Sequence, residues 1–364
     1  MLDSPGPAGS PDRVLRVDWN TPSVAVSQAI GRPCPAFVFA NAGDQAYGRF
    51  LLDPASEPAA ARQLLEVPEA KQDPLERTML WGALWDDVHV ANSAPRGYVD
   101  LALKSLPAEA DESLARVQGA RVATALHSYL TGAARRALLP TVESVVADRM
   151  LHAPELGLRI VAFRIFTSIA ETPLALKQTK DLLTGKLSVP GLDLKPLDRW
   201  NLVGHLIAMS DPEAPAIYAA EQARDRTGEG QKYAYVAEAA TPSPDIKARY
   251  FDEYLHSRTI QEDWITQSLR AFNAWSQTAL TAPYLVRSLN QLPEIKLHRK
   301  IFFLGAWLGA FLDGQNTLEA SPQAQAAVRA WLADETIDPD LRLKVLEASD
   351  ALDRTVRIGR KFPE

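Results

Sequence analysis

The side chains of this sequence that are best suited to bind a metal ion or transfer protons are six histidines: His89, His127, His152, His205, His256 and His298. A zinc site built on one helix needs two histidines four residues apart, with a glutamate after the first that acts as general base. His127 and His152 are the closest two and lie far more than four residues apart, and glutamate follows none of the six. We therefore expect no zinc site formed by a local motif, and only a site assembled from distant residues stays open.

Other catalytic motifs are also missing from the sequence. No G-x-S-x-G segment marks an activated serine, and TGEGQKY and LLTGKLS lack glycines that a phosphate-binding loop requires. Carboxylate pairs such as Asp86–Asp87 and Asp252–Glu253 are adjacent in the sequence. On a helix adjacent side chains point about 100° apart and do not converge on a substrate, so we interpret these pairs as solvated helix faces.

Tyr284 and Arg287, in the segment APYLVRSL, offer a different chemistry, the binding of a carboxylate. They lie one turn apart on an expected helix, and a hydroxyl beside a guanidinium can hold the carboxylate of a peptide. The same pair is also an ordinary arrangement near a helix end. Trp81 and Trp85 are a second candidate, as an aromatic platform for a ligand, but the leucines beside them favour a position in the core.

Composition and charge narrow the class of protein. The contents of 46% hydrophobic and 23% charged residues are typical of soluble globular proteins. A formal net charge of −6, with basic residues interspersed among the acids, argues against a nucleic-acid partner. Cys34 is the single cysteine, so no internal disulfide can form.

Two further segments of the sequence concern the cellular location of the protein. The longest apolar run, residues 301–312, is too short to span a bilayer and is interpreted as a central buried helix. Residues 1–13 lack the apolar core of a secretory signal. We therefore expect no membrane partner and a cytoplasmic location.

The spacing of apolar residues predicts a mainly α-helical protein. Residues 1–13 are rich in Pro, Gly and Ser and are expected to be disordered. Residues 14–54 contain short segments, VLRVDW, AFVFAN and YGRFLLD, that predict a few short β-strands with a turn at Ala42-Gly43-Asp44. From residue 55 to residue 364, apolar residues recur at helical spacing in about fifteen segments joined by short loops.

The arrangement of these helices is also expected from the pattern. Short antiparallel helices without one dominant bundle favour stacked helix pairs, and no repeat consensus is visible. We expect an irregular HEAT-like α-solenoid, a superhelical domain with a concave face for binding. Several start and stop residues mark helices: Asp111, Ser243 and Asp338 at N-termini, and Gly132, Gly185 and Gly314 near C-termini.

Several segments in the same order carry a family resemblance. DPLERTMLWGALWDDV, followed by YVDLALKSLPAEADESLARV, resembles the start of the helical C-terminal domain of aminopeptidase N type zinc metallopeptidases. Upstream, IGRPCPAFVFANAGDQAYGRFLLD looks like the last strands of the β-sandwich domain that precedes it in that family. PSPDIKARYFDEYL and LTAPYLVRSLNQLPEI are similar to two later helices, so the resemblance covers residues 14 to about 312.

The resemblance implies a bowl of helices that closes over an active site and forms a chamber for short peptides. In that family the zinc ligands, the general-base glutamate, the G-x-M-E-N segment and the transition-state tyrosine belong to an earlier domain. None of them has a counterpart in this sequence. The resemblance therefore implies no cofactor in this chain, zinc in a separate catalytic domain, and that domain and peptides as partners.

Three interpretations of function stay open. The first is a non-catalytic C-terminal part or subunit of an aminopeptidase N type enzyme, inactive alone, that forms the chamber wall and docks to a catalytic zinc domain through its short β segment. The second is a stand-alone helical-repeat module that binds peptides or proteins without enzymatic activity. The third, retained for completeness, is a hydrolase whose zinc site is assembled from distant residues.

Overall fold

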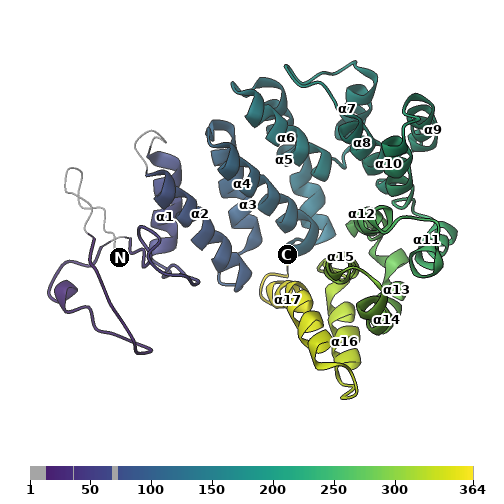
Figure 1. The fold of residues 1–364 in the computed structure, drawn as a ribbon. Coiled ribbons are helices and arrows are strands. Elements are labelled where there is room, and N and C mark those ends of the chain that lie inside the picture. The colour runs from purple at the N-terminus through teal and green to yellow at the C-terminus, as the bar shows by residue number, and fades with distance from the viewer. Residues whose placement is uncertain (1–13, 36, 68–72, 364) are drawn as a thin grey trace. The chain divides into compact units, whose positions relative to one another are not determined.

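The computed structural model describes residues 14–35, 37–67 and 73–363, so the predicted disorder of residues 1–13 lies outside the described part. The described residues form helices α1 to α17 and contain no strand (Figure 1). No helix among them is both long and apolar enough to cross a membrane. The chain divides into two compact units, Met1–Val122 and Ala123–Glu364, and the predicted domain bounds stay a prediction.

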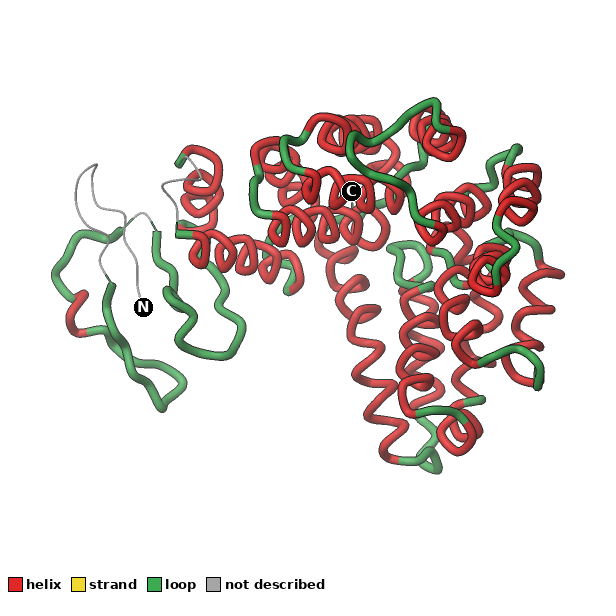
Figure 2. The backbone as a smooth tube through the Cα atoms, turned by 45° about the horizontal axis from the view of Figure 1, so that its top comes forward, coloured by secondary structure: helices red, strands yellow, loops and turns green. Residues whose placement is uncertain are grey.

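Residues 14–55 of the first unit form loops and turns where short strands were predicted (Figure 2). The predicted turn is present, because Asp44 N donates to Asn41 O at 2.9 Å and Gly43 adopts a φ of 77°. A short 3₁₀ helix, Ser27–Ala29, is the one helical element of this segment in its described part. The predicted strands themselves are absent from the residues that the structure describes here.

The missing strands have a physical reason, which is that a strand needs a neighbouring strand to pair its main-chain groups. Phe37 and Phe39 are both buried, as alternation in a strand requires. However, Val38 N donates to the side-chain hydroxyl of Ser56 at 2.8 Å instead of to another strand. The amide of Asn41 closes the next turn with two hydrogen bonds to the main chain of Ala46. Side chains thus form the hydrogen bonds with main-chain groups that a second strand would otherwise form.

The helices of the first unit are α1 (Ser56–Glu66), α2 (Pro74–His89), α3 (Pro95–Ser105) and α4 (Glu112–Thr124), and α4 runs across the boundary between the units. Trp81 and Trp85 of α2 pack against Tyr98 of α3, with ring centroids 5.5 and 4.8 Å apart. Both tryptophans are buried. The core interpretation of this pair is confirmed.

A buried ion pair joins α2 to the segment before α4. Arg77 Nη2 lies 3.0 Å from Glu109 Oε1, and Gln118 Nε2 donates to Glu109 Oε2 at 3.3 Å. Asp111 accepts from Leu114 N at 2.7 Å and so caps α4, as predicted. The acidic residues at this point of the sequence therefore stabilise the fold.

The second unit begins with a π-helical turn, Ala125–Tyr129, which continues from α4. The remaining helices follow in order: α5 (Gly132–His152), α6 (Leu156–Ile169), α7 (Pro173–Thr184), α8 (Pro196–Ala208), α9 (Ala214–Arg224), α10 (Gly228–Glu238), α11 (Pro244–His256), α12 (Glu262–Phe272), α13 (Thr278–Asn290), α14 (Leu292–His298), α15 (Ile301–Asp313), α16 (Ser321–Leu332) and α17 (Pro339–Lys361). Ser243 and Asp338 are N-caps and Gly185 is a left-handed C-cap, which confirms these predictions.

Gly132 was expected to end a helix, and in the structure it begins α5. Thr131 is the N-cap of α5 and accepts from Ala134 N at 3.2 Å. The helix then continues through Pro140, although proline is unfavourable inside a helix. A capping threonine thus outweighs the local signals of glycine and proline, and the preceding helix ends in the π-helical turn instead.

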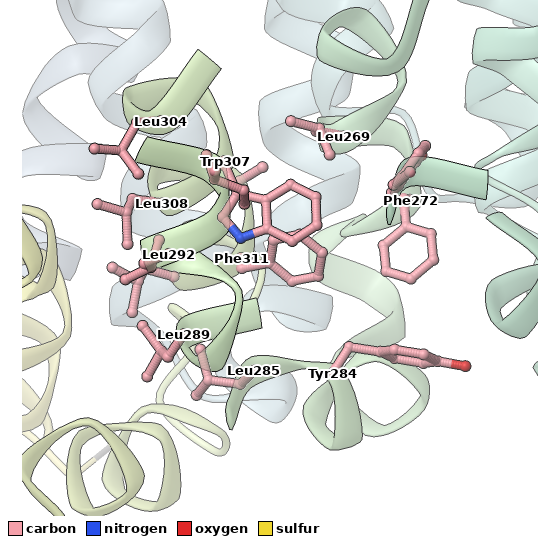
Figure 3. Close-up of a cluster of buried hydrophobic side chains, with 14 of the residues drawn as sticks. Leu269, Phe272, Tyr284, Leu285, Leu289, Leu292, Leu304, Trp307, Leu308 and Phe311 are labelled. Atoms are coloured by element: carbon pink, nitrogen blue, oxygen red, sulfur yellow. The ribbon is translucent and has the colours of Figure 1, made fainter. Parts of the chain in front are cut away.

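A large hydrophobic core of the second unit lies among α11 to α17 and is rich in aromatic side chains (Figure 3). Trp307 is fully buried, and its indole Nε1 donates to Ser288 O at 3.1 Å. Lys247 is also fully buried, and its ammonium donates to Ala239 O at 2.8 Å and to Phe272 O at 2.6 Å. Burial lowers the pKa of Lys247 to about 7.

Candidate functional site

Six helices of the second unit form a row in which each contacts the next: α6, α8, α10, α12, α15 and α17. The helices between them in the sequence, α7, α9, α11, α13 and α16, pack against the row (Figure 1). At its end α17 contacts the π-helical turn that starts the unit, and Gly132 N donates to Glu319 Oε1 at 3.0 Å. The two ends of this unit therefore meet, and we refer to the six helices as the helix row.

The first groove on the helix row, which we call the α6–α12 groove, crosses α6, α8, α10 and α12 and has a volume of about 420 Å³. Small residues dominate its surface, among them Gly204, Ala208, Ala237 and Ala271. A Cβ atom added at Gly204 would lie 3.5 Å from the Cα of Ala237, an ordinary van der Waals contact, so α8 and α10 pack closely at this point. The groove is thus a shallow, mostly apolar surface of the size that small ligands occupy.

A polar cluster lies beside the α6–α12 groove, and His205 belongs to both. The π-helical turn carries His127, whose ring stacks on Trp275 with centroids 4.2 Å apart. The Arg135 guanidinium lies 4.4 Å from the same Trp275 ring, and Arg135 Nε lies 3.4 Å from Glu171 Oε1. His205 Nε2 donates to Ala170 O at 2.6 Å. We call His127, Arg135, Glu171, His205 and Trp275 the His127 cluster.

Burial shifts the pKa values of two side chains in the His127 cluster, His127 and Glu171. Burial, together with smaller contributions from the charge of Arg135 and the neighbouring His205, lowers the pKa of His127 to about 3. Burial also raises the pKa of Glu171, although Arg135 opposes that effect. His127 Nε2, Arg135 Nε and Glu171 Oε1 are buried and form no hydrogen bond with another described residue. The five residues of the cluster include no serine, threonine or cysteine, so the cluster does not resemble a catalytic triad.

The second groove, which we call the α15 groove, is larger, with a volume of about 850 Å³, and lies among α14, α15 and α17. One face of α15 forms its floor, with Phe302, Gly305, Gly309 and Asp313 at helical spacing. Phe302 is 86% exposed, and the space beside each glycine is open. The expectation that residues 301–312 form a central buried helix therefore holds only for the core side of α15, because the helix is open on this face.

Charged side chains surround the α15 groove, and most of the basic ones are paired within the fold. Lys296 lies 2.8 Å from Asp338 and 3.1 Å from Asp340, and Arg299 Nη2 donates to Tyr254 O at 2.6 Å. In contrast, Asp313 has no hydrogen bond or ion pair from its side chain within the described residues. The surrounding protein desolvates Asp313 and raises its pKa, an effect that Arg270 opposes.

The structure does not bring the six histidines together. His89, His152, His256 and His298 each lie 2.9 to 3.9 Å from a carboxylate one turn earlier on the same helix. His127 and His205 belong to the cluster described above. Across the described residues no group of three or more His, Cys, Asp and Glu side chains is placed to hold a metal ion, so these residues do not fit the zinc site that the resemblance associates with the family.

Tyr284 and Arg287 lie on α13, outside the helix row. The Tyr284 ring is buried, with its centroid 4.9 Å from that of Phe251 and 5.3 Å from that of Phe272, and its hydroxyl points away from the cluster (Figure 3). The Arg287 guanidinium lies 4.6 Å from the Phe251 ring and 5.1 Å from the Tyr284 ring. This geometry accounts for the pair by packing, and its predicted role in binding a carboxylate stays a prediction.

Sequence reasoning missed both the His127 cluster and the open face of α15. The cluster draws its members from residues 127 to 275, so no local spacing reveals it. The α15 face has a signal, because Phe302, Gly305, Gly309 and Asp313 recur at intervals of three and four residues within an apolar run. Two glycines and an acid on one stripe distinguish an open face from a buried one.

Comparisons with known proteins agree with this architecture. Residues 37–354 match the family described as ERAP1-like C-terminal domain. The chain is 28% identical over 363 residues to aminopeptidase N of Streptomyces lividans. That similarity covers 98% of this chain, whereas the chain spans 41% of the length of the relative. The match to the C-terminal domain confirms the resemblance seen in the sequence and extends it beyond residue 312.

Proposed function

Because this chain belongs to the ERAP1-like C-terminal domain family, we propose that it is the non-catalytic helical part of an aminopeptidase N type zinc enzyme. The family match over residues 37–354 is the observation that carries the proposal. In this proposal zinc and the groups that activate water lie in a separate catalytic domain or chain. The helical part then contributes binding, orientation and the exclusion of water from the reaction.

The helix row supplies the wall of the peptide chamber in this proposal. The contacts along the row, with the intervening helices packed against it, support the proposal of an irregular HEAT-like α-solenoid whose row face is available to a ligand. Both the α6–α12 groove and the α15 groove open on helices of this row. In this proposal the small residues of the α6–α12 groove and the open, glycine-containing face of the α15 groove accommodate a peptide of variable sequence.

Residues 14–55 provide the docking surface for the catalytic part. This segment exposes large apolar side chains, with Trp19 at 53% and Ile30 at 75%, and Tyr47 is fully exposed. Exposed apolar residues on an extended segment mark a protein interaction site, and extended segments readily pair with an additional strand. The segment therefore adds to a sheet of the catalytic part and acquires there the strand pairing that it lacks within the described chain.

Co-purification tests this function. The part of S. lividans aminopeptidase N outside its match to this chain is produced separately and mixed with the purified chain, and the complex is measured by size-exclusion chromatography and calorimetry. We expect a stable one-to-one complex. A chain that stays a soluble monomer with no affinity for the catalytic part contradicts the proposal.

A stand-alone peptide-binding module is the second candidate, because the two grooves on the helix row do not depend on another chain. The same experiment separates the two functions. A monomer that ignores the catalytic part yet binds peptides on the helix row supports the module, whereas association with the catalytic part supports the peptidase role.

A further inference from the structure

The C-terminal ends of α8 and α10 are joined by one buried side chain, Gln277, which follows α12 in the sequence. Gln277 Nε2 donates to Ala208 O at 3.2 Å and to Ala240 O at 2.7 Å. Ala208 is the last residue of α8, and Ala240 lies two residues beyond the end of α10. Carbonyl groups at and just beyond a helix C-terminus have no partner within the helix, so one amide group satisfies a carbonyl at each end and links the two helices.

The two carbonyl groups that Gln277 joins belong to residues that line the α6–α12 groove. One turn earlier α8 and α10 are already in contact, where Gly204 faces Ala237. A contact between residues this small limits how closely two helices approach, but it offers no interdigitated side chains that would hold their ends together. The bridge made by Gln277 lies beyond this contact, so it is placed to set the width of the groove at the helix ends.

The oxygen of the Gln277 amide supports a bridging role for the side chain. Gln277 is 5% exposed, and its Oε1 is buried without a hydrogen bond to another described residue. A buried acceptor without a partner lowers stability, whereas the hydrogen bonds to α8 and α10 are both formed. The amide is therefore used for the link between the two helices and not for complete hydrogen bonding within the core.

A second buried donor links α10 to the next helix of the row. Lys247 Nζ donates to Ala239 O just after α10 and to Phe272 O at the end of α12. The ends of α8, α10 and α12 thus form a series in which each neighbouring pair is joined by one buried side chain. Gln277 makes the link that lies under the α6–α12 groove.

We propose that Gln277 is a positioning residue of the α6–α12 groove, because its bridge between the ends of α8 and α10 sets the width of the groove. Loss of the bridge lets the two helix ends separate about the close contact of Gly204 with Ala237. The groove then widens, and a peptide held in it loses contacts on one side. The spacing follows from the hydrogen bonds alone, whereas its consequence for peptides rests on the proposed function.

The distance between the ends of α8 and α10 tests the inference directly on the full chain. Cys34 is replaced by serine, and spin labels are attached at Ser210→Cys and Thr241→Cys, which follow the two helices. Gln277→Met keeps the length of the side chain and removes both donor bonds. We expect the mean distance between the labels, measured by electron paramagnetic resonance, to increase by about 1–2 Å, the size of shifts between packed helices.

Gln315→Met is the matched control, because Gln315 is also a buried amide and donates to Thr278 O and Thr281 Oγ1, away from the α6–α12 groove. Both variants should lower the midpoint of urea unfolding, but only Gln277→Met should change the distance. If Gln277→Met does not fold, Gln277→Asn keeps the amide on a shorter side chain that cannot reach both carbonyl groups, and it should lengthen the distance too. An unchanged distance in a folded variant of Gln277, or an equal change in Gln315→Met, would overturn the inference.

The complex with the catalytic part tests the consequence for peptides. Gln277→Met should raise the KM of the complex for a seven-residue alanine-rich peptide, with kcat unchanged, because it removes binding that does not take part in the chemistry. Turnover of leucyl-p-nitroanilide, a substrate with one residue, should stay the same. An unchanged KM for the peptide despite a longer distance would overturn the positioning role. A natural chain that forms no complex would instead contradict the proposed function, and the distance measurement on the chain alone would still decide whether Gln277 sets the spacing.

Discussion

Helices α11 to α17 and the segment of residues 14–55 contain similar apolar side chains but use them in opposite ways. Trp307 and Phe311 are buried among other aromatic rings, whereas Trp19, Ile30 and Tyr47 face solvent. A helix satisfies its main-chain hydrogen bonds within itself and then buries one face. An extended segment needs a neighbour to satisfy its main chain, so the helical region is complete in itself and the segment is suited to a partner.

Removing the buried Trp307 ring from the α11–α17 core should lower the stability of the helical region. Trp307→Ala deletes a side chain that contacts Phe251, Phe303 and Phe311, and we expect a loss of about 3–5 kcal/mol in the free energy of unfolding. Trp19→Ala is the matched control and should change stability by less than about 0.5 kcal/mol. Urea unfolding followed by circular dichroism measures both, and equal losses would show that the two regions are not different in kind.

Lys247 provides a second test of the helical region, because this region buries even an ionisable side chain. Its pKa is lowered to about 7 by burial, against an ordinary value of 10.5. Between pH 7 and 9.5 the unfolded state binds the proton and the folded state does not, so stability should rise by up to about 1.4 kcal/mol per pH unit. Above that range the slope should reverse, because burial raises the pKa of Tyr250 and Tyr254 and the unfolded state loses their protons first.

Lys247→Met is the variant that isolates this effect. Urea unfolding at several values between pH 7 and 9.5 should show a flatter profile for the variant than for the natural chain. A profile that keeps the full slope would show that another group titrates in this window.

Substitutions in the segment of residues 14–55 should weaken its binding to the catalytic part and leave the stability of the chain unchanged. Ile30→Ser and Tyr47→Ser together remove two exposed apolar side chains and should weaken association with the catalytic part about tenfold, as expected for anchors of an interface. The free energy of unfolding should stay within about 0.5 kcal/mol. Leu174→Ser, at an exposed leucine of α7, is the control that should leave association unchanged.

The smallest expected effect belongs to Arg287, at the edge of the aromatic core. Arg287→Ala removes the guanidinium from the rings of Phe251 and Tyr284 and should cost about 0.5–1 kcal/mol of stability. The packing interpretation expects the variant to bind a peptide with a free carboxylate and its amide in the same ratio as the natural chain. A changed ratio would restore the predicted carboxylate site at Tyr284 and Arg287.

Residue pattern predicts much of the fold because helices depend on local spacing. The core position of Trp81 and Trp85 and the caps Ser243 and Asp338 follow from neighbours within a few residues. The strands were predicted from the same kind of pattern, but alternation cannot say whether a partner strand exists, and Val38 bonds to Ser56 instead.

The candidate site is less accessible to sequence reasoning. The His127 cluster combines residues from four separate segments, and its members meet only after the helices pack. In α15, glycines count as apolar in a run such as IFFLGAWLGAFL, so the open face is hidden by an apparently uniform pattern. Tertiary packing decides which of these faces stays open.

The central claim is that this chain shapes a peptidase chamber and depends on another part for the chemistry. Turnover of an aminoacyl-p-nitroanilide by the pure chain, with and without added zinc and after addition of the catalytic part, tests it most directly. The account predicts no turnover by the chain alone at any zinc concentration and turnover once the catalytic part is bound. Zinc-dependent turnover by the pure chain would contradict it.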